Sequence, residues 1–413
     1  MNDKINHIEF DLTSRCNLQC KYCYLELTPC LEKTDISPKI VDDFFANLIK
    51  YNRIEQRIVY TFWGGEPLLN FDMIKYIVKN YGNFKVNEKS VECNFIIISN
   101  GTLINKEIAA FCSENNISIQ ITIDGDKESH DKLRTFSSGR GSYNKIISNI
   151  KLLQRQKVRY VIRSTLTSSS LLPSEIIDLC MGHGFNNNAF ATVSSTSIYK
   201  DSMQPDFIKK VANDYFDAYE KQVLKKNDFH STQLLNFKKT LLSKKATASC
   251  GLSRNRICVR HDGLLFPCHR FVKLDELSIG NVWEDISYDN TVLSMVELNP
   301  KCKVCSFKYF CGGSCVFEAF INKDFSYLGN YCLFNQELIK RTFKQLINKH
   351  EFKIQENTTS IMINVNIHSN VVYARSKYVE LIDLIDDGII FDKRKIEDKS
   401  QLSKIILLLR RID

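Results

Sequence analysis

Short runs of β-branched and aromatic residues alternate with amphipathic stretches over the first 200 residues of the chain. Six runs read as strands bounded by Gly, Asn or Ser, namely residues 7–13, 57–65, 94–101, 118–125, 159–167 and, with a less regular pattern, 188–195. Five stretches between them carry apolar residues three or four positions apart, as helices do, namely residues 37–51, 71–84, 105–115, 141–156 and 172–184. This alternation predicts an α/β fold with a parallel sheet, either doubly wound or curled into a partial barrel.

The pattern changes in the second half of the chain. Residues 205–245 read as one or two Lys-rich helices, whereas residues 250–335 lose regular periodicity and hold eight of the fifteen cysteines. Ligands, more than a hydrophobic core, are therefore expected to hold this cysteine-rich region together. Helical periodicity returns at 335–350.

The tail predicts a small α+β module. Residues 360–376 read as a two-stranded hairpin that turns at Ser369-Asn370, and helical patterns follow at 377–388 and 400–412. Four parts are thus expected: a sheet domain at 1–200, a helical linker at 201–249, a loop-dominated cysteine-rich domain at 250–335, and a helix with the small module at 336–413.

Length and charge exclude several classes of protein. At 413 residues and 44% apolar composition, the chain can bury a large core. The net charge of +9 is spread over amphipathic patterns without a basic block, so no nucleic-acid partner is expected. The N-terminus lacks the basic flank and apolar run of a signal peptide, and no segment approaches about 20 uninterrupted apolar residues. A cytoplasmic location without a membrane partner is expected.

Fifteen cysteines in such a chain point to metal or cluster ligation, because a reducing cytosol disfavours disulfides. Cys16, Cys20 and Cys23 follow a C-x3-C-x2-C spacing just after the first predicted strand. Structural zinc sites take four protein ligands, whereas three local thiolates suit a cubane iron–sulfur cluster whose fourth iron binds another ligand. Cys30 is the alternative fourth ligand, which would close the site.

This spacing, with aromatic Tyr22 before the last cysteine, resembles the signature of radical S-adenosylmethionine (SAM) enzymes. The resemblance implies a partial (β/α)6 barrel, a [4Fe–4S] cluster and SAM, which the reduced cluster cleaves to a 5′-deoxyadenosyl radical. The protein supplies orientation and exclusion of water.

Further motifs follow the predicted strands in the order that this family has. "WGGEP" (63–67) ends the second strand, "SNGT" (99–102) the third and "ITIDG" (121–125) the fourth, while two arginines follow at later positions. The resemblance implies that residues from these motifs bind or orient SAM, together with Tyr22: Gly65, Glu66, Ser99, Thr122, Arg134 and Arg163. Taken singly, each arginine would be read as a surface or helix-capping side chain.

The later cysteines form a second group. "CKVCSFKYFCGGSC" reads C-x2-C-x5-C-x3-C and follows "DGLLFPC" (262–268). A zinc ribbon is one interpretation, but eight thiolates after a radical SAM domain resemble the SPASM extension, which binds two auxiliary [4Fe–4S] clusters.

That resemblance implies an interleaved ligand set, in which one auxiliary cluster takes Cys250, Cys268 and Cys315 and the other takes Cys302, Cys305, Cys311 and Cys332. Cys258 either completes the first of these clusters or leaves it an open iron. Cys93, Cys112 and Cys180 fall in strand or helix patterns and read as buried apolar residues.

The resemblance favours a maturase of ribosomally made precursor peptides, which abstracts a side-chain hydrogen and forms a carbon–carbon or thioether cross-link. Sulfatase-maturating enzymes, which make formylglycine, share both halves but carry an aspartate base directly after the "PC" cysteine. That position is His269 here, the candidate catalytic residue. Other radical SAM dehydrogenases and a non-catalytic iron–sulfur or zinc protein remain the alternatives.

Two macromolecular partners are implied. One is a precursor peptide with a leader, which the tail from about residue 353 could take up along an exposed hairpin edge. The alternative is that this tail only packs on the barrel. The other partner is an external one-electron reductant such as flavodoxin or ferredoxin.

Overall fold

The computed structural model describes much of the chain residue by residue, with side chains placed up to Thr342. The described ranges are 4–27, 34–194, 199, 201, 203–225, 229–231, 233–235, 255–285, 299–305, 311–313, 315–321, 329–348, 352–356, 360–365, 382–385 and 388–392. They fall into two compact units, of which the first comprises Met1–Leu171, Glu175–Ser202 and Gly251–Leu293. The second comprises Leu172–Ser174, Met203–Cys250 and Ser294–Asp413.

A parallel sheet forms the centre of the first unit. Its six successive parallel strands lie in the order β10-β9-β7-β6-β3-β1. Their bounds are Ile5–Asp11 (β1), Ile54–Trp63 (β3), Glu92–Ser99 (β6), Ser118–Thr122 (β7), Tyr160–Leu166 (β9) and Asn188–Thr192 (β10). Every neighbouring pair is parallel and consecutive along the chain, so the predicted six-stranded partial barrel is confirmed.

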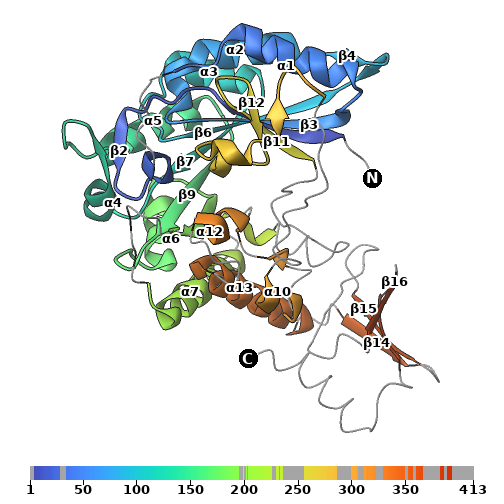
Figure 1. Cartoon of the computed structure of the whole chain (residues 1–413). Coiled ribbons are helices and arrows are strands. Elements are labelled where there is room, and N and C mark those ends of the chain that lie inside the picture. Colours follow the sequence, from blue (N-terminus) through green and yellow to red (C-terminus); the bar gives the residue numbers. More distant parts are fainter. Residues whose placement is uncertain are drawn as a thin grey trace. The chain divides into compact units, whose positions relative to one another are not determined.

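The crossover helices lie within a few residues of the predicted stretches: Pro38–Lys50 (α1), Phe71–Tyr81 (α2), Lys106–Glu114 (α3), Tyr143–Arg155 (α5) and Pro173–Gly182 (α6). Ser37 caps α1 by accepting a hydrogen bond from the backbone N–H of Ile40. One short helix, Lys127–Leu133 (α4), was not predicted, because seven residues give too few turns for a periodic signal. In Figure 1, α1, α2 and α3 run together along one side of the sheet.

The outer face of the sheet is an aromatic core. The Phe10 ring of β1 lies 6.0 Å from Phe44 and 6.2 Å from Phe45 of α1, and Tyr81 of α2 stacks on Phe45 at 3.8 Å. Side chains alternate along a strand, so His7, Glu9 and Asp11 point to the opposite, inner face of the barrel. Polar and charged groups on β1 are therefore placed inside the barrel.

Part of the cysteine-rich region extends the barrel sheet. Strand Arg256–Val259 (β11) pairs in parallel with β1, and Leu264–Phe266 (β12) and Gly280–Asn281 (β13) follow antiparallel. Two small ribbons complete the described strands of this unit, Leu18–Cys20 (β2) with Arg134–Phe136 (β8), and Lys85–Val86 (β4) with Lys89–Ser90 (β5). The register sets Glu9 opposite Cys258, which puts both on the inner face.

The second unit is built on two long helices, Pro205–Leu224 (α7) and Gly329–Asn348 (α13). Tyr215 of α7 stacks on Phe334 of α13 with ring centroids 6.5 Å apart, and both rings are buried. Short helices Pro300–Lys303 (α10) and Val316–Ile321 (α12) lie in the cysteine-rich stretch. The helix predicted from residue 335 thus begins at Gly329.

The tail forms a four-stranded antiparallel sheet in the order β14-β15-β17-β16. Its strands are Phe352–Glu356, Ser360–Val365, Ile382–Ile385 and Gly388–Asp392, numbered β14 to β17 along the chain. The helix predicted over 377–388 is wrong at 382–385, because the apolar run there pairs with β17. The predicted turn at Ser369-Asn370 and the predicted helix at 400–412 lie outside the described residues. Strand β15, which covers the first part of the predicted hairpin, pairs with β14 and β17.

Candidate functional site

The first cysteine group lies in the loop that follows β1. Burial raises the pKa of the Cys16 thiol to about 12, and the nearby Glu66, Cys20 and Cys23 raise it further, while the backbone N–H of Leu18 donates to its sulfur at 3.4 Å. The three thiols are therefore close enough to interact electrostatically. Cys20 is anchored by its register position opposite Arg134 in the β2–β8 ribbon.

Tyr22 ties this loop to the end of β7. Its hydroxyl donates to Asp124 and accepts a hydrogen bond from the Arg134 guanidinium at 2.7 Å. Burial raises the pKa of Tyr22 and of Asp124. Arg134 is buried, not at the surface, and its hydrogen bond to Tyr22 holds the cysteine loop.

The turn after β3 approaches the cysteine loop so closely that it requires glycine. Gly64 has φ +144°, and a Cβ on Gly64 or Gly65 would collide with the carbonyl oxygens of Thr13 and Arg15. The backbone N–H of Gly65 donates to the Thr13 carbonyl at 2.8 Å. The "WGGEP" turn is therefore fixed against the loop that carries the cysteines.

Glu66 is fully buried and joins this turn to the end of β6. Its carboxylate accepts hydrogen bonds from the Ser99 hydroxyl at 2.8 Å, the Asn100 backbone N–H at 2.7 Å and the Leu68 backbone N–H at 3.2 Å. Burial nevertheless raises the pKa of Glu66 to about 7. Its hydrogen-bond donors are neutral, and the effect of the Arg134 cation is smaller than that of burial, which penalises the charged form.

A second bridge runs from the cysteine loop to the same strand end. The Asn17 side chain accepts from Asn100 at 2.8 Å and donates to Thr102 at 2.8 Å. Asn149 of α5 then donates to the carbonyls of Gly101 and Thr102. The "SNGT" turn is thus held from two sides, which the sequence did not indicate.

Thr122 and Arg163 are neighbours on adjacent strands. They are directly opposite in the β7–β9 register, so both face the inner side of the barrel. Arg163 is exposed and lies near enough to the Asp124 carboxyl to lower its pKa, against the larger effect of burial. This arrangement brings a hydroxyl and a cation together at one strand end.

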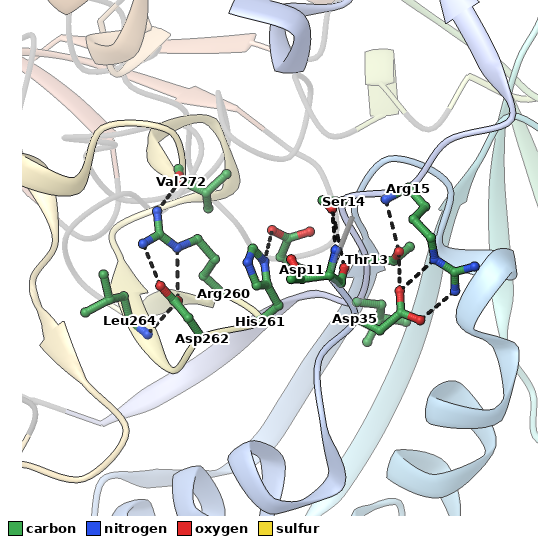
Figure 2. A network of polar contacts seen from close by, with 12 residues as sticks. Asp11, Thr13, Ser14, Arg15, Asp35, Arg260, His261, Asp262, Leu264 and Val272 are labelled. Atoms are coloured by element: carbon green, nitrogen blue, oxygen red, sulfur yellow. Dashed lines mark hydrogen bonds and ion pairs between the residues drawn. The ribbon is translucent and has the colours of Figure 1, made fainter. Parts of the chain in front are cut away.

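Figure 2 shows a polar network beside the start of the cysteine loop, with His261 facing Asp11 and the Arg15 fork closing on Asp35. The His261 ring lies 3.7 Å from the Asp11 carboxylate, and burial raises the pKa of Asp11. Arg260 pairs with Asp262 in the β11–β12 hairpin. This network joins the hairpin from the cysteine-rich region to β1.

His269 lies where the barrel meets the loop after β12. Its ring centroid is 5.1 Å from Trp63 and 6.3 Å from Tyr24, the residue that directly follows Cys23. Its backbone N–H and its Nδ1 both lie 2.8 Å from the carboxylate of Glu9. The sequence singled out His269 but gave no signal for Glu9, since a charged residue in a strand pattern reads as solvent-facing.

Cys258 and Cys268 belong to the first unit. Cys258 is fully buried on β11, where burial raises the pKa of its thiol, and Cys268 is near enough to raise it further. Cys315 is half-buried in the second unit, and Cys250 lies outside the described residues. The two possible roles of Cys258 therefore stay open.

Four cysteines come together within the second unit. Burial raises the pKa of Cys311 to about 12, and Cys332, Cys302 and Cys305 add to that rise. The pKa of Cys332 is raised to about 12 by burial and by Cys302 and Cys305. These are the four residues that the sequence grouped as one auxiliary site.

Among the described residues, no three Cys, His, Asp or Glu side chains converge closely enough to share a single metal. Each thiolate of a cubane binds a different iron, so cluster ligands stand further apart than the ligands of one zinc ion. Thiols, the donors of both cysteine groups, are the ligands that iron–sulfur clusters take in proteins.

Cys93, Cys112 and Cys180 lie in β6, α3 and α6. Cys112 and Cys180 are buried, as an apolar role requires, and Cys93 is half-buried beside the Tyr60 hydroxyl.

None of the helices among the described residues has the length and apolar character needed to cross a bilayer. Cys30 lies outside those residues.

This chain is similar in sequence to known proteins. Residues 10–175 match the model of the Radical SAM superfamily. The chain is 28% identical to a cysteine-type anaerobic sulfatase-maturating enzyme of Clostridium novyi over 73% of this chain and 85% of that protein.

Two solved structures share the fold. Native anSMEcpe with bound AdoMet and Cp18Cys peptide superimposes with a TM-score of 0.70 at 22% identity, covering 84% of this chain and 99% of that one. Streptococcus suis SuiB bound to precursor peptide SuiA gives a TM-score of 0.57 at 15% identity, covering 80% of this chain and 76% of that one.

Proposed function

We propose that this chain, whose residues 10–175 match the Radical SAM superfamily, is a radical SAM enzyme that oxidises a side chain of a ribosomally made precursor peptide and closes a carbon–carbon or thioether cross-link. The observation that carries the proposal is the residue after Cys268. Sulfatase maturases are expected to have an aspartate there, whereas this chain has His269, held beside the cysteine loop by Glu9 and packed on Trp63.

The residues present fit a cluster and SAM. Cys16, Cys20 and Cys23 would hold a [4Fe–4S] cluster, because their thiols lie together in one loop and Cys20 and Cys23 are near enough to raise the pKa of Cys16. Cys302, Cys305, Cys311 and Cys332 would hold one auxiliary cluster, and Cys250, Cys268 and Cys315, with or without Cys258, the other. When bound, the cofactor and its clusters supply a radical that removes one hydrogen atom and a path for the second electron.

The strand ends would position SAM. The Gly64-Gly65 turn brings backbone close to the cysteine loop, and Glu66 with Ser99 fixes that turn. Thr122 and Arg163 would meet the polar parts of SAM, since they share the inner face at adjacent strand ends.

His269 would accept the proton that the substrate loses. Cross-linking removes two hydrogens from the peptide, one as an atom and one as a proton, with one further electron withdrawn while the new bond forms. A neutral imidazole near the reacting carbon serves as the proton acceptor. Trp63 and Tyr24 flank the ring and would exclude water from it.

The tail would bind the leader of the precursor. A four-stranded sheet ends in edge strands β14 and β16, and an extended peptide can add to such an edge. Deleting residues 353–413 should weaken leader affinity at least tenfold in a fluorescence titration. Unchanged affinity would assign the tail to packing.

A second function is favoured by one observation. The sulfatase-maturating enzyme of C. novyi shares 28% identity over most of both chains. Formylglycine formation from cysteine removes two hydrogens and also replaces sulfur by oxygen, whereas a cross-link removes two hydrogens and keeps every heavy atom. Mass spectrometry of the Cp18Cys peptide and of a precursor peptide after incubation separates the two products.

Anaerobic reconstitution tests the enzyme class. About twelve irons per chain and reductant-dependent 5′-deoxyadenosine are expected, with flavodoxin or ferredoxin as the electron source. Cys16→Ala should lose about four irons and all SAM cleavage, since the remaining cysteines still hold the auxiliary clusters. Zinc in place of iron would refute the proposal.

A further inference from the structure

A charged cluster lies on the inner face of the barrel. We call His7, Glu9, Thr61 and Arg256 the β1 cluster. The register sets His7 opposite Arg256 and Glu9 opposite Thr61, so all four side chains share the inner face of β1, β3 and β11. No part of the proposed cofactor binding uses them.

Glu9 is the centre of this cluster and is fully buried. The Arg256 guanidinium forms an ion pair with Glu9 Oε1 at 3.2 Å. The same guanidinium lies 3.4 Å from His7 Nε2. His7 Nε2 in turn lies 2.9 Å from the Thr61 hydroxyl. Burial opposes the charge on Glu9, but His269 and Arg256 outweigh it and lower the pKa of Glu9 to about 2.

A buried charged network is a poor way to gain stability, because apolar residues of similar volume usually serve as well or better. A positional role explains it more directly. Glu9 holds His269 at two points, since Oε2 accepts from the backbone N–H and Oε1 lies 2.8 Å from Nδ1. Two anchors on one residue fix both the chain path and the ring orientation.

The second anchor also sets the tautomer. An ionised carboxylate only accepts hydrogen bonds, so the ring nitrogen that faces it carries a proton. In the neutral ring, Nε2 is then the nitrogen with the lone pair. Trp63 and Tyr24 lie beside the ring, and Tyr24 follows Cys23 directly.

We infer that Glu9 is a positioning residue, which holds the His269 ring so that Nε2 is presented to the substrate while Arg256 and His7 keep Glu9 in place. This inference rests on the proposed role of His269 in peptide oxidation. A histidine held by a buried glutamate would thus stand where sulfatase maturases are expected to have a single aspartate.

The test compares four variants of the reconstituted holoenzyme. Glu9→Gln keeps the shape but places an amide against Nδ1, His269→Asn removes the ring, and a double variant combines them. Asp42→Asn is the matched control, because it alters a carboxylate that accepts from two tyrosines on the helix side of the sheet. The readout is modified peptide formed per 5′-deoxyadenosine.

Glu9→Gln should lower this ratio about 10- to 100-fold, the cost measured when a carboxylate that orients a metal-bound histidine is removed. It should add nothing in the His269→Asn background, because both changes act on one ring. Asp42→Asn should leave the ratio unchanged. A crystal structure of Glu9→Gln should show the His269 ring displaced, with the cluster cysteines in place.

The outcomes separate the two ideas. If His269→Asn lowers the ratio but Glu9→Gln does not, or if the ring stays in place in the variant crystal, the inference about Glu9 is overturned alone. If His269→Asn leaves the ratio unchanged, the proposed proton acceptor is wrong, and the positioning role falls with it.

Discussion

Glu9 and Glu66 are both fully buried in the same barrel, yet their carboxyl groups differ in charge. Glu9 lies against His269 and Arg256, and its pKa falls to about 2 although burial opposes this. Glu66 has only neutral donors within hydrogen-bond distance, and burial raises its pKa to about 7. The hydrogen-bond and ion-pair partners of each carboxyl, and not its depth in the fold, decide whether it is an anion.

The two environments suit different tasks. A permanent anion at Glu9 can hold a ring and a guanidinium in one orientation. The Glu66 carboxyl, whose pKa lies near 7, joins two turns through hydrogen bonds without a fixed charge. Each of the following predictions would break this contrast if it failed.

Glu9→Gln should show the largest effect on stability. At pH 7 the variant should lose about 3 kcal/mol of unfolding free energy, since the favourable shift in the pKa of Glu9 is lost. The thermal unfolding midpoint of the reconstituted protein, with Asp42→Asn as control, measures this. A midpoint equal to the wild type would mean that Glu9 is not held as an anion.

Glu66→Gln should show a pH effect of opposite sign. The folded pKa of about 7 lies above the ordinary value of 4.5, so the folded state binds the proton more tightly and wild-type stability falls as pH rises between them. The variant should therefore gain up to about 3 kcal/mol on the wild type between pH 5 and pH 8. Parallel midpoint curves over that range would contradict the raised pKa.

Below pH 4.5 the wild type should lose stability as the pH falls. Because the folded pKa of Glu9 is about 2, its contribution is complete above its ordinary value of 4.5 and is lost as pH falls toward 2. Glu9→Gln should remove this acid-dependent loss while Glu66→Gln keeps it. Acid titration of far-UV circular dichroism on the three proteins checks the assignment.

Arg256→Met should have the smallest effect, about 1.5 kcal/mol, because His269 still stabilises the Glu9 anion. The pKa of His7, lowered to about 4 by burial and then by Arg256, should rise in this variant. Thermal midpoints and histidine NMR titration of the variant and the wild type measure both changes. An effect larger than that of Glu9→Gln would make Arg256 the centre of the cluster.

The sequence predicted the barrel well because its signals are local. Alternating strands and helices gave all six parallel strands, and the spacing of Cys16, Cys20 and Cys23 indicated the chemistry. Glu66 and Arg134 were found through motifs at strand ends. The Glu66 contacts with Ser99 join residues 33 positions apart in the chain, which no local pattern contains.

The parts that the sequence missed depend on register. Glu9 lies in a run of otherwise apolar residues, and only the pairing of β1 with β11 brings Arg256 next to it. His269 reaches Glu9 across 260 positions of chain. The predicted helix at 377–388 failed for a similar reason, because pairing between β16 and β17 overrides the local pattern.

The central claim is that a precursor peptide gains a cross-link, with the loss of two hydrogens and no heavy atom, in a reaction initiated at the three-cysteine loop. The most direct measurement is high-resolution mass spectrometry of precursor peptides encoded beside this protein, after anaerobic incubation with SAM and reductant. The account predicts a loss of two hydrogens per modification with 5′-deoxyadenosine formed, and neither with Cys16→Ala. A peptide modified equally by Cys16→Ala, or a product in which sulfur is replaced by oxygen, would contradict it.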